Sequence, residues 1–532
     1  MYSNRRISIF LAFLLLGLMT FLTPLLWGPP GSDAGIFTWV AHVVLQGGLP
    51  YVDAFDNKGP ALFYIYAFVL WLGGGEWFAV RMLDFVLAYG CIAITVIWLR
   101  SIGGPSTGWI GGLLLLLFLH FDFWTLGQPD LWAAEAAIVM LWLIECSRRT
   151  ATCLLAGVLA GLMVVLKPVY IPFAAVVFLL VLFPQGLRSF AFRACLAFAC
   201  GALLCPLAVL SIYALHGQLY ALWEVNILFA LKSYRGLGNN PAFYHILMPG
   251  ILQLPRGDMG YQMIGIGMIT LQFVMLAGLY RLMRDGYKRL AIRLLVAWGC
   301  AFFIASWQGK YFFYHYCLLL FVAVIPAAYW LSRPLPVGGL RERLALYGRG
   351  MVVMLLATQS LFFLSPAFEG WKVRLGLKPN SEWLAESFVH GNYEFARVKE
   401  AASYINAHTN ADDLIYVWGT EAYLYPLAQR AAPTRFGYNH AFVMSKEPLR
   451  SQFVTELLAD LTINQPALVI IQKTDENDLT RRSIESLSDF PSIEQLFRQN
   501  YTQLWENKSF LLLKRNMDPF KPEPLRTPVV IP

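Results

Sequence analysis

Long apolar runs separated by short polar turns recur along most of the chain, from Ile7 to Pro366. Each run is close to the length of about 20 residues with which an α-helix crosses a bilayer. Beyond residue 366 apolar positions mix with polar and charged ones. The pattern predicts about eleven membrane-spanning helices, at 7–27, 78–99, 107–121, 131–146, 151–166, 168–184, 191–215, 262–280, 292–306, 312–331 and 350–366.

Three segments between or after these runs are long enough to fold at a membrane surface: 28–77, 216–261 and the tail after 366. In the first, Ser32 is a suitable N-cap, and apolar residues at helical spacing follow it as far as Gly47. A second helix is predicted from Pro60 to Leu72. Both are expected to lie at the membrane interface.

The tail alternates helical and extended patterns, which is typical of a small α/β layer. We therefore predict an all-α polytopic membrane protein with a transmembrane catalytic domain at 1–366 and a soluble α/β domain at 367–532. The tail's predicted elements are helices at 395–407, 421–428 and 448–463, strands at 413–418 and 467–472, and a terminal hairpin at 501–506 and 510–514.

Composition agrees with a membrane protein. Of the 532 residues, 58% are hydrophobic and 14% charged, and the mean hydropathy is +0.54, whereas soluble domains carry about 25% charged residues. All eight cysteines lie in or beside apolar runs, so neither a disulfide framework nor a zinc knuckle is indicated.

Lys and Arg are concentrated in alternate short loops, beginning with Arg5 and Arg6 before the first run and continuing with Arg148 and Arg149. Because cytoplasmic loops retain positive charge, this asymmetry predicts a cytoplasmic N-terminus. The loop at 28–77 and the tail then lie together on the exterior, or periplasmic, side. The net charge of +8 is accounted for by the cytoplasmic loops, and we predict no nucleic-acid partner.

The loop at 28–77 holds the strongest candidates for chemistry. Asp33 lies in the first turn of a predicted helix, where the helix dipole favours an ionised carboxylate, and Asp56 and Lys58 follow in a turn. Alone, such residues are usually caps or turn residues. Charge at membrane depth is costly, however, and usually faces a cavity or pathway. Together with Arg81 at the start of the second span, these residues indicate a site.

Other cations and aromatic residues have two interpretations each. Lys58 either extends to lipid headgroups or binds a substrate phosphate. Arg81 either pairs with Glu76 or Asp84 or binds a substrate phosphate. Lys167 is an interfacial anchor or a phosphate ligand, and His315 an interfacial residue or a substrate contact. The sequence leaves these alternatives open.

Three features of the chain match a known family: Asp33-x-Gly35, the run Phe55-Asp56-Asn57-Lys58-Gly59-Pro60, and Arg81 opening the second span. The chain resembles the membrane-embedded glycosyltransferases of the C-type superfamily, which use polyprenyl-phosphate sugars. The family includes protein O-mannosyltransferases, aminoarabinose transferases acting on lipid A, and lipopolysaccharide-core glycosyltransferases. The resemblance covers roughly 1–366 in layout.

The resemblance implies an inverting transfer of a sugar from a polyprenyl-phosphate donor to an extracytoplasmic acceptor, which is a glycan, lipid or protein. It implies a multi-pass protein of the inner, or plasma, membrane. Asp33 is expected to take the acceptor's proton as general base, and cations are expected to stabilise the leaving phosphate. The expected substrate-binding residues are Asp56, Lys58, Arg81, Lys310, His315 and Tyr316.

Two positions depart from the family. Ala34 and Asn57 stand where several relatives have carboxylates. Asp130 is a possible substitute, and a site with Asp56 and Asp130 oxygens would suit Mg²⁺ or Mn²⁺. A divalent cation at Asp130 is therefore one expectation, and a reaction without metal is the other.

Two other function classes remain as alternatives. A transporter or flippase of a lipid-linked sugar usually has polar groups near the membrane midplane and two related halves, but we find no repeated half. An O-antigen ligase or polymerase would not need the early Asp-x-Gly loop. We expect a glycosyltransferase.

Overall fold

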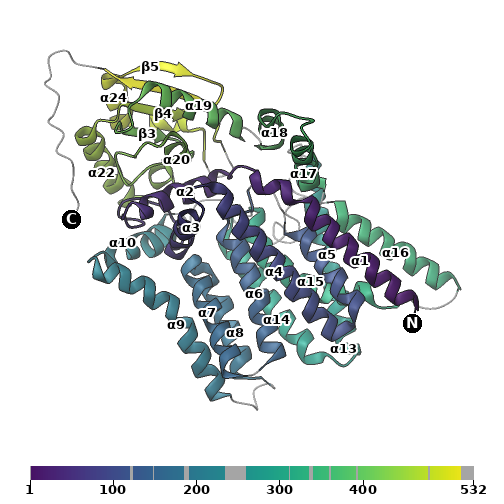
Figure 1. Cartoon of the computed structure of the whole chain (residues 1–532). Helices are drawn as coiled ribbons and strands as arrows, with labels where there is room; N and C mark the ends of the chain where they lie inside the picture. Colours follow the sequence, from purple (N-terminus) through teal and green to yellow (C-terminus); the bar gives the residue numbers. More distant parts are fainter. Residues whose placement is uncertain are drawn as a thin grey trace.

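The computed structural model describes residues 2–119, 124–147, 149–184, 191–233, 259–310, 312–334, 339–358, 361–390, 393–476 and 480–516. Helices form most of it, and a small sheet lies at one end (Figure 1). The predicted fold class, a polytopic helical membrane protein with a C-terminal α/β unit, is confirmed.

The described chain contains six helical segments long and apolar enough to cross a membrane, and five shorter apolar ones of 10–17 residues. Helix α15 lies in the middle of the bundle, with most of its side chains buried. The bundle helices are α1 (Tyr2–Phe21), α4 (Trp77–Gly103), α5 (Pro105–Phe118), α6 (Pro129–Cys146), α7 (Thr150–Leu166), α8 (Ile171–Leu182), α9 (Phe192–Leu215), α13 (Met259–Arg284), α14 (Lys288–Gln308), α15 (Cys317–Ser332) and α16 (Gly339–Ala357).

Two boundaries differ from the sequence expectation. The predicted span at 350–366 falls on two helices, α16 and α17 (Leu361–Arg374). Pro366 lies inside α17, so the helix continues past the predicted domain boundary. Pro366 lies beyond the first turn of α17, where a proline removes one helical hydrogen bond, but the helix continues past it to Arg374.

The two predicted helices of the first loop are present as α2 (Ser32–Leu45) and α3 (Pro60–Leu72). Pro60 occupies the first turn of α3, where its missing N–H removes no helical hydrogen bond. Ser32 is not the N-cap of α2. Gly31 occupies that position, and the Ser32 hydroxyl donates instead to the carbonyl of Thr420, 3.4 Å away.

The second surface segment is described only as far as residue 233. It forms α10 (Leu219–Trp223), a π-helical stretch (Glu224–Phe229) and α11 (Ala230–Lys232). The next part of the predicted segment, residues 234–258, lies outside the described residues.

The C-terminal domain, residues 380–516, is built on a four-stranded sheet in the order β3-β4-β6-β5. Strands β3 (Ile415–Trp418) and β4 (Leu468–Gln472) are parallel, and β6 (Phe510–Arg515) is antiparallel to both β4 and β5 (Tyr501–Glu506). The predicted strands and terminal hairpin are present. The domain's other elements are α18 (Asn380–Ser387), β1 (Val389–His390), β2 (Tyr393–Glu394), α19 (Phe395–His408), α20 (Leu424–Ala428), α21 (His440–Val443), α22 (Leu449–Asn464), α23 (Ser483–Ser486) and α24 (Pro491–Asn500).

The C-terminal domain lies at the end of the bundle and packs directly on α2 (Figure 1). Glycines allow this approach: a Cβ added to Gly35 of α2 would stand 2.7 Å from Tyr423 Cβ, and one added to Gly437 would stand 2.4 Å from the Trp39 ring. Arg435 fixes the contact by donating to Tyr51 O at 2.9 Å and pairing with Glu224 at 3.1 Å. The domain and the Asp33 loop therefore lie on one side of the molecule.

Candidate functional site

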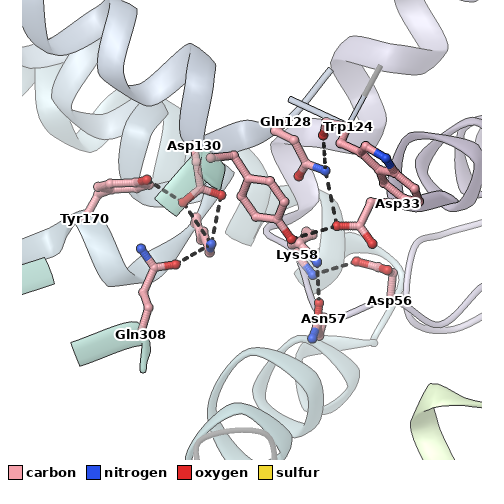
Figure 2. A network of polar contacts seen from close by, with 11 residues as sticks. Asp33, Asp56, Asn57, Lys58, Trp124, Gln128, Asp130, Tyr170 and Gln308 are labelled. Atoms are coloured by element: carbon pink, nitrogen blue, oxygen red, sulfur yellow. Dashed lines mark hydrogen bonds and ion pairs between the residues drawn. The ribbon is translucent and has the colours of Figure 1, made fainter. Parts of the chain in front are cut away.

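Asp33 stands in the first turn of α2, and its carboxylate is held by two neutral donors from other parts of the chain. Gln128 Nε2 and the Tyr314 hydroxyl each donate to Asp33 Oδ2 at 3.1 Å (Figure 2). Gln128 immediately precedes α6, and Tyr314 lies in the 3₁₀ turn at Phe313–Tyr316 before α15. We call these three residues and Lys58 the Asp33 network.

The charge state of Asp33 follows from its neighbours. Burial opposes ionisation, but the Lys58 ammonium and the hydrogen bonds from Gln128 and Tyr314 outweigh it and lower the pKa of the Asp33 carboxyl. The carboxylate is therefore ionised at neutral pH, as a general base must be.

The turn at Asp56–Lys58 presents a cation next to Asp33. Asp56 Oδ1 accepts from the Lys58 N–H at 2.8 Å, and Lys58 Nζ donates to Asn57 Oδ1 at 2.9 Å (Figure 2). Gly59 follows, and a Cβ there would stand 2.1 Å from the carbonyl oxygen of Val165, so the turn can approach α7 only with glycine at this position.

The backbone before this turn is unusual. Tyr51 has a φ of 71°, a left-handed conformation that is uncommon for any residue but glycine. Its ring stacks on Tyr213 with 6.0 Å between centroids, and its hydroxyl donates a short hydrogen bond to Lys58 O. Tyr51 is thus held from two sides and in turn fixes the backbone that carries Lys58. Such conformations cluster at functional sites.

A second carboxylate group lies beside the first. Lys167 Nζ reaches both oxygens of Asp130, at 2.9 and 2.8 Å, and the Tyr170 hydroxyl donates to Oδ1 at 2.6 Å. Lys167 also donates to Gln308 Oε1 at 2.6 Å (Figure 2). We call these four residues the Asp130 network. Lys167 is thus partnered by a carboxylate rather than by the membrane surface.

Three lysines bring positive charge to this region. Burial, together with the like charges of Lys167 and Lys58, lowers the pKa of Lys310 to about 8. The three ammonium groups are therefore close enough to repel one another. A cluster of like charges in a partly buried site favours an anionic ligand.

The other predicted substrate contacts are distributed around this cluster. His315 and Tyr316 are buried in the turn before α15, and the His315 ring lies edge-on to Tyr314 with 4.8 Å between centroids. Arg81 is buried at the start of α4; it donates to Pro29 O at 2.5 Å and lies over the Trp77 ring. Arg81 thus supports the backbone leading into Asp33.

The proposed metal ligands do not fit a divalent cation as they are arranged. Asp130 oxygens are occupied by Lys167 and Tyr170, and Asp56 oxygens by the Lys58 N–H and the Tyr438 hydroxyl. Among the described residues no group of three or more His, Cys, Asp or Glu side chains is placed to hold a metal ion. We therefore derive no step through a metal.

Sequence analysis did not identify the residues that the C-terminal domain contributes to the site. The Tyr438 hydroxyl donates to Asp56 Oδ2 at 2.7 Å, and His440 is close enough to Asp33 for the charge of that carboxylate to act on its imidazole. Gln128 and Tyr314 were missed as well. No periodicity or motif marks these residues, because their contacts join positions far apart in the chain.

No family model matches this chain, and no curated protein does. Among solved structures, ArnT from Cupriavidus metallidurans bound to undecaprenyl phosphate aligns with a TM-score of 0.59 and 12% identity, over 94% of this chain and 97% of that one. The same protein in the apo state aligns with a TM-score of 0.58 and 14% identity, over 96% of this chain and 98% of that one.

A third structure, the archaeal oligosaccharyltransferase AglB from Archaeoglobus fulgidus with an inhibitory peptide and a dolichol-phosphate, gives a TM-score of 0.48 at 12% identity, over 89% of this chain and 70% of that one. The comparison with ArnT covers both the bundle and the C-terminal domain. The chain therefore shares the ArnT fold along nearly its whole length.

Proposed function

We propose that this protein is an inverting glycosyltransferase that moves a sugar from a polyprenyl-phosphate donor to the hydroxyl of an acceptor, with Asp33 as general base. The observation that carries the proposal is the Asp33 carboxylate, which Gln128 and Tyr314 hold through one oxygen, near the ammonium groups of Lys58 and two further lysines. A base next to an anion-binding cluster is what this reaction requires.

In the reaction, the acceptor oxygen attacks the anomeric carbon from the face opposite the phosphate, and its proton passes to Asp33. The bond between that carbon and the phosphate oxygen breaks, and its electron pair leaves with the phosphate. Lys58 and Lys310 stabilise the charge that develops on this leaving group. One displacement inverts the anomeric centre.

The fold supports the lipid-linked donor. The structure of ArnT aligned above was determined bound to undecaprenyl phosphate. In the present chain, Lys58 precedes α3, Lys167 follows α7 and Lys310 follows α14, so the lysine cluster lies at the ends of apolar helices. A polyprenyl chain would lie along the bundle in the bilayer while its phosphate meets the lysines. The Lys and Arg distribution supports a position of this face outside the cytoplasm.

The test measures the lipid-linked sugar pool in cells. Membranes carrying Asp33→Asn should accumulate one polyprenyl-phosphate sugar as membranes without the protein do, because the substitution removes the base. Asp53→Asn is the matched control, since Asp53 is an exposed carboxylate of the same loop that accepts only a backbone N–H. Mass spectrometry of the extracted lipids names the donor.

Two results would contradict the proposal. One is a donor pool in the Asp33→Asn membranes that matches wild type. The other is a wild-type protein that, after purification in detergent, does not bind undecaprenyl phosphate. If Asp33→Asn instead lost transport of a lipid-linked sugar across the membrane and kept sugar transfer, the result would favour a flippase.

A further inference from the structure

One segment of the C-terminal domain, Phe436–His440, is fixed on both of its sides. Towards the bundle, Tyr438 donates to Asp56, and Gly437 packs against the Trp39 ring of α2. Towards its own domain, the Asn439 N–H donates to Gly419 O at 3.0 Å and its side chain donates to Ser483 Oγ at 2.6 Å. The position of His440 beside α2 is therefore determined by the fold.

His440 presents an unsatisfied nitrogen at this position. Its Nε2 is shielded from solvent and has no hydrogen-bond partner among the described residues. A buried polar atom without a partner costs about 1–3 kcal/mol, so native proteins rarely keep one without a reason. The neighbouring charged groups are Asp33 and Lys58, the proposed base and the nearest cation.

The imidazole is neutral in this environment. Burial lowers the pKa of His440 to about 4, and the opposing influence of the Asp33 carboxylate does not restore it. A neutral imidazole has one N–H and one lone pair, and a hydroxyl group can both donate and accept. The imidazole can therefore form a hydrogen bond with a hydroxyl group either as donor or as acceptor. It does not compete with Asp33 for a proton at neutral pH.

We propose that His440 is an acceptor-binding residue whose Nε2 forms a hydrogen bond with the acceptor hydroxyl beside Asp33. This inference rests on the proposed glycosyl transfer, and it assigns the acceptor side of the site to the C-terminal domain. His440 orients the acceptor oxygen and keeps its own proton. The acceptor's proton goes to Asp33, the new bond forms to the anomeric carbon, and the bond to phosphate breaks.

The experiment separates acceptor binding from donor binding. Total lipid-linked sugar extracted from membranes lacking the protein serves as donor, and envelope membranes from the same cells serve as acceptor. In His440→Phe the ring that lies against Tyr438 remains but the nitrogen is lost. The amount of envelope membrane giving half-maximal transfer should rise about tenfold, as expected for one lost hydrogen bond at a satisfied site. The half-saturating donor concentration should not change.

Two further variants make the result specific. His440→Gln places an amide near the position of Nε2, so it should transfer better than His440→Phe. If His440 had only a structural role, His440→Phe would be the milder change, because it keeps the ring. His408→Phe is the matched control, because His408 is an exposed histidine of the same domain that also lies against a tyrosine, with 3.9 Å between centroids. It should transfer like wild type.

Unchanged acceptor dependence in His440→Phe would overturn the inference, as would an equal change in donor and acceptor dependence. If both variants fold, Gln no better than Phe counts against the proposal. If the Phe variant does not fold, the Gln variant decides, and unchanged acceptor dependence in it, or an equal change in donor and acceptor dependence, overturns the inference. Failure of the proposed function itself is distinguishable, because the wild-type protein would then neither transfer sugar nor bind undecaprenyl phosphate.

Discussion

The Asp33 and Asp130 networks contain similar residues, a carboxylate with a lysine, a tyrosine and a glutamine, but they are arranged for different purposes (Figure 2). Asp130 is fully buried, and its two oxygens are bound by Lys167 and Tyr170. Asp33 is part-exposed, and both of its hydrogen bonds come from neutral groups to a single oxygen. The first arrangement neutralises a charge, whereas the second keeps a carboxylate available for a proton.

The two networks also differ in what holds them. Asp130, Lys167, Tyr170 and Gln308 all belong to the bundle, on α6, on the connection between α7 and α8, and on α14. The Asp33 network depends on α2, and α2 is covered by the C-terminal domain through Gly35 and Trp39. Changes at the domain contact should therefore reach Asp33 and leave Asp130 intact.

The largest expected effect separates the two carboxylates. Asp33→Asn should lower sugar transfer by about 10²–10⁴-fold, the usual contribution of a general base, while its thermal unfolding in detergent stays close to wild type. Asp130→Asn should instead lower the stability of the protein, because it leaves Lys167 buried without its ion pair. The expected cost in the free energy of unfolding is about 3–5 kcal/mol. Equal unfolding temperatures for Asp130→Asn and wild type would show that the networks do not differ as argued.

A second prediction concerns the Asp130 ion pair. The double variant Asp130→Asn with Lys167→Met should be more stable than Asp130→Asn alone, because no unpaired charge remains in the bundle. Thermal unfolding of both variants measures this recovery. If Lys167 is needed instead as a phosphate ligand, the double variant will fold well but bind undecaprenyl phosphate more weakly than wild type.

The third prediction tests the dependence of Asp33 on the domain contact. Gly35→Ala places a methyl group 2.7 Å from Tyr423 Cβ, so α2 and the C-terminal domain must separate by a few tenths of an ångström or more. Transfer should fall by about tenfold or more, since small displacements at a reacting centre are costly. Gly90→Ala in α4 is the control, because nothing lies within 4 Å of its added Cβ. Equal transfer by the two variants would argue against the coupling.

The smallest expected effect is on pH dependence of stability. Glu421, in the domain contact near Gly35, is buried, and its pKa is raised to about 8 by that burial and by the charge of Asp475. The unfolded chain ionises Glu421 at much lower pH, so the free energy of unfolding should fall as pH rises from about 5 to about 8. Asp475, whose burial raises its pKa to about 6, acts in the same direction over the lower part of this range.

Glu421→Gln should make thermal unfolding less sensitive to pH, with the gain over wild type appearing above neutral pH. Glu400→Gln, at an exposed position of the same domain, should keep the wild-type dependence. A wild-type protein equally stable at pH 5 and pH 9 would contradict the assignment of a buried, protonated Glu421.

The sequence by itself determined the bundle, the interfacial helices α2 and α3, and the strands and hairpin of the C-terminal domain. These follow from local rules: apolar runs of spanning length, helical periodicity, Pro60 in a first turn, and alternation in short strands. It also predicted Asp33, Asp56 and Lys58 as site residues, because all three lie in one loop of an apolar chain, where charged side chains are costly.

Only the tertiary structure decided which groups surround Asp33. Gln128, Tyr314 and His440 reach it from the start of α6, the turn before α15 and the C-terminal domain. It also decided that Asp130 pairs with Lys167 rather than remaining open to a metal. Hydrogen bonds and ion pairs form wherever the packed elements bring partners within about 3 Å, and sequence periodicity carries no information about which distant elements will meet.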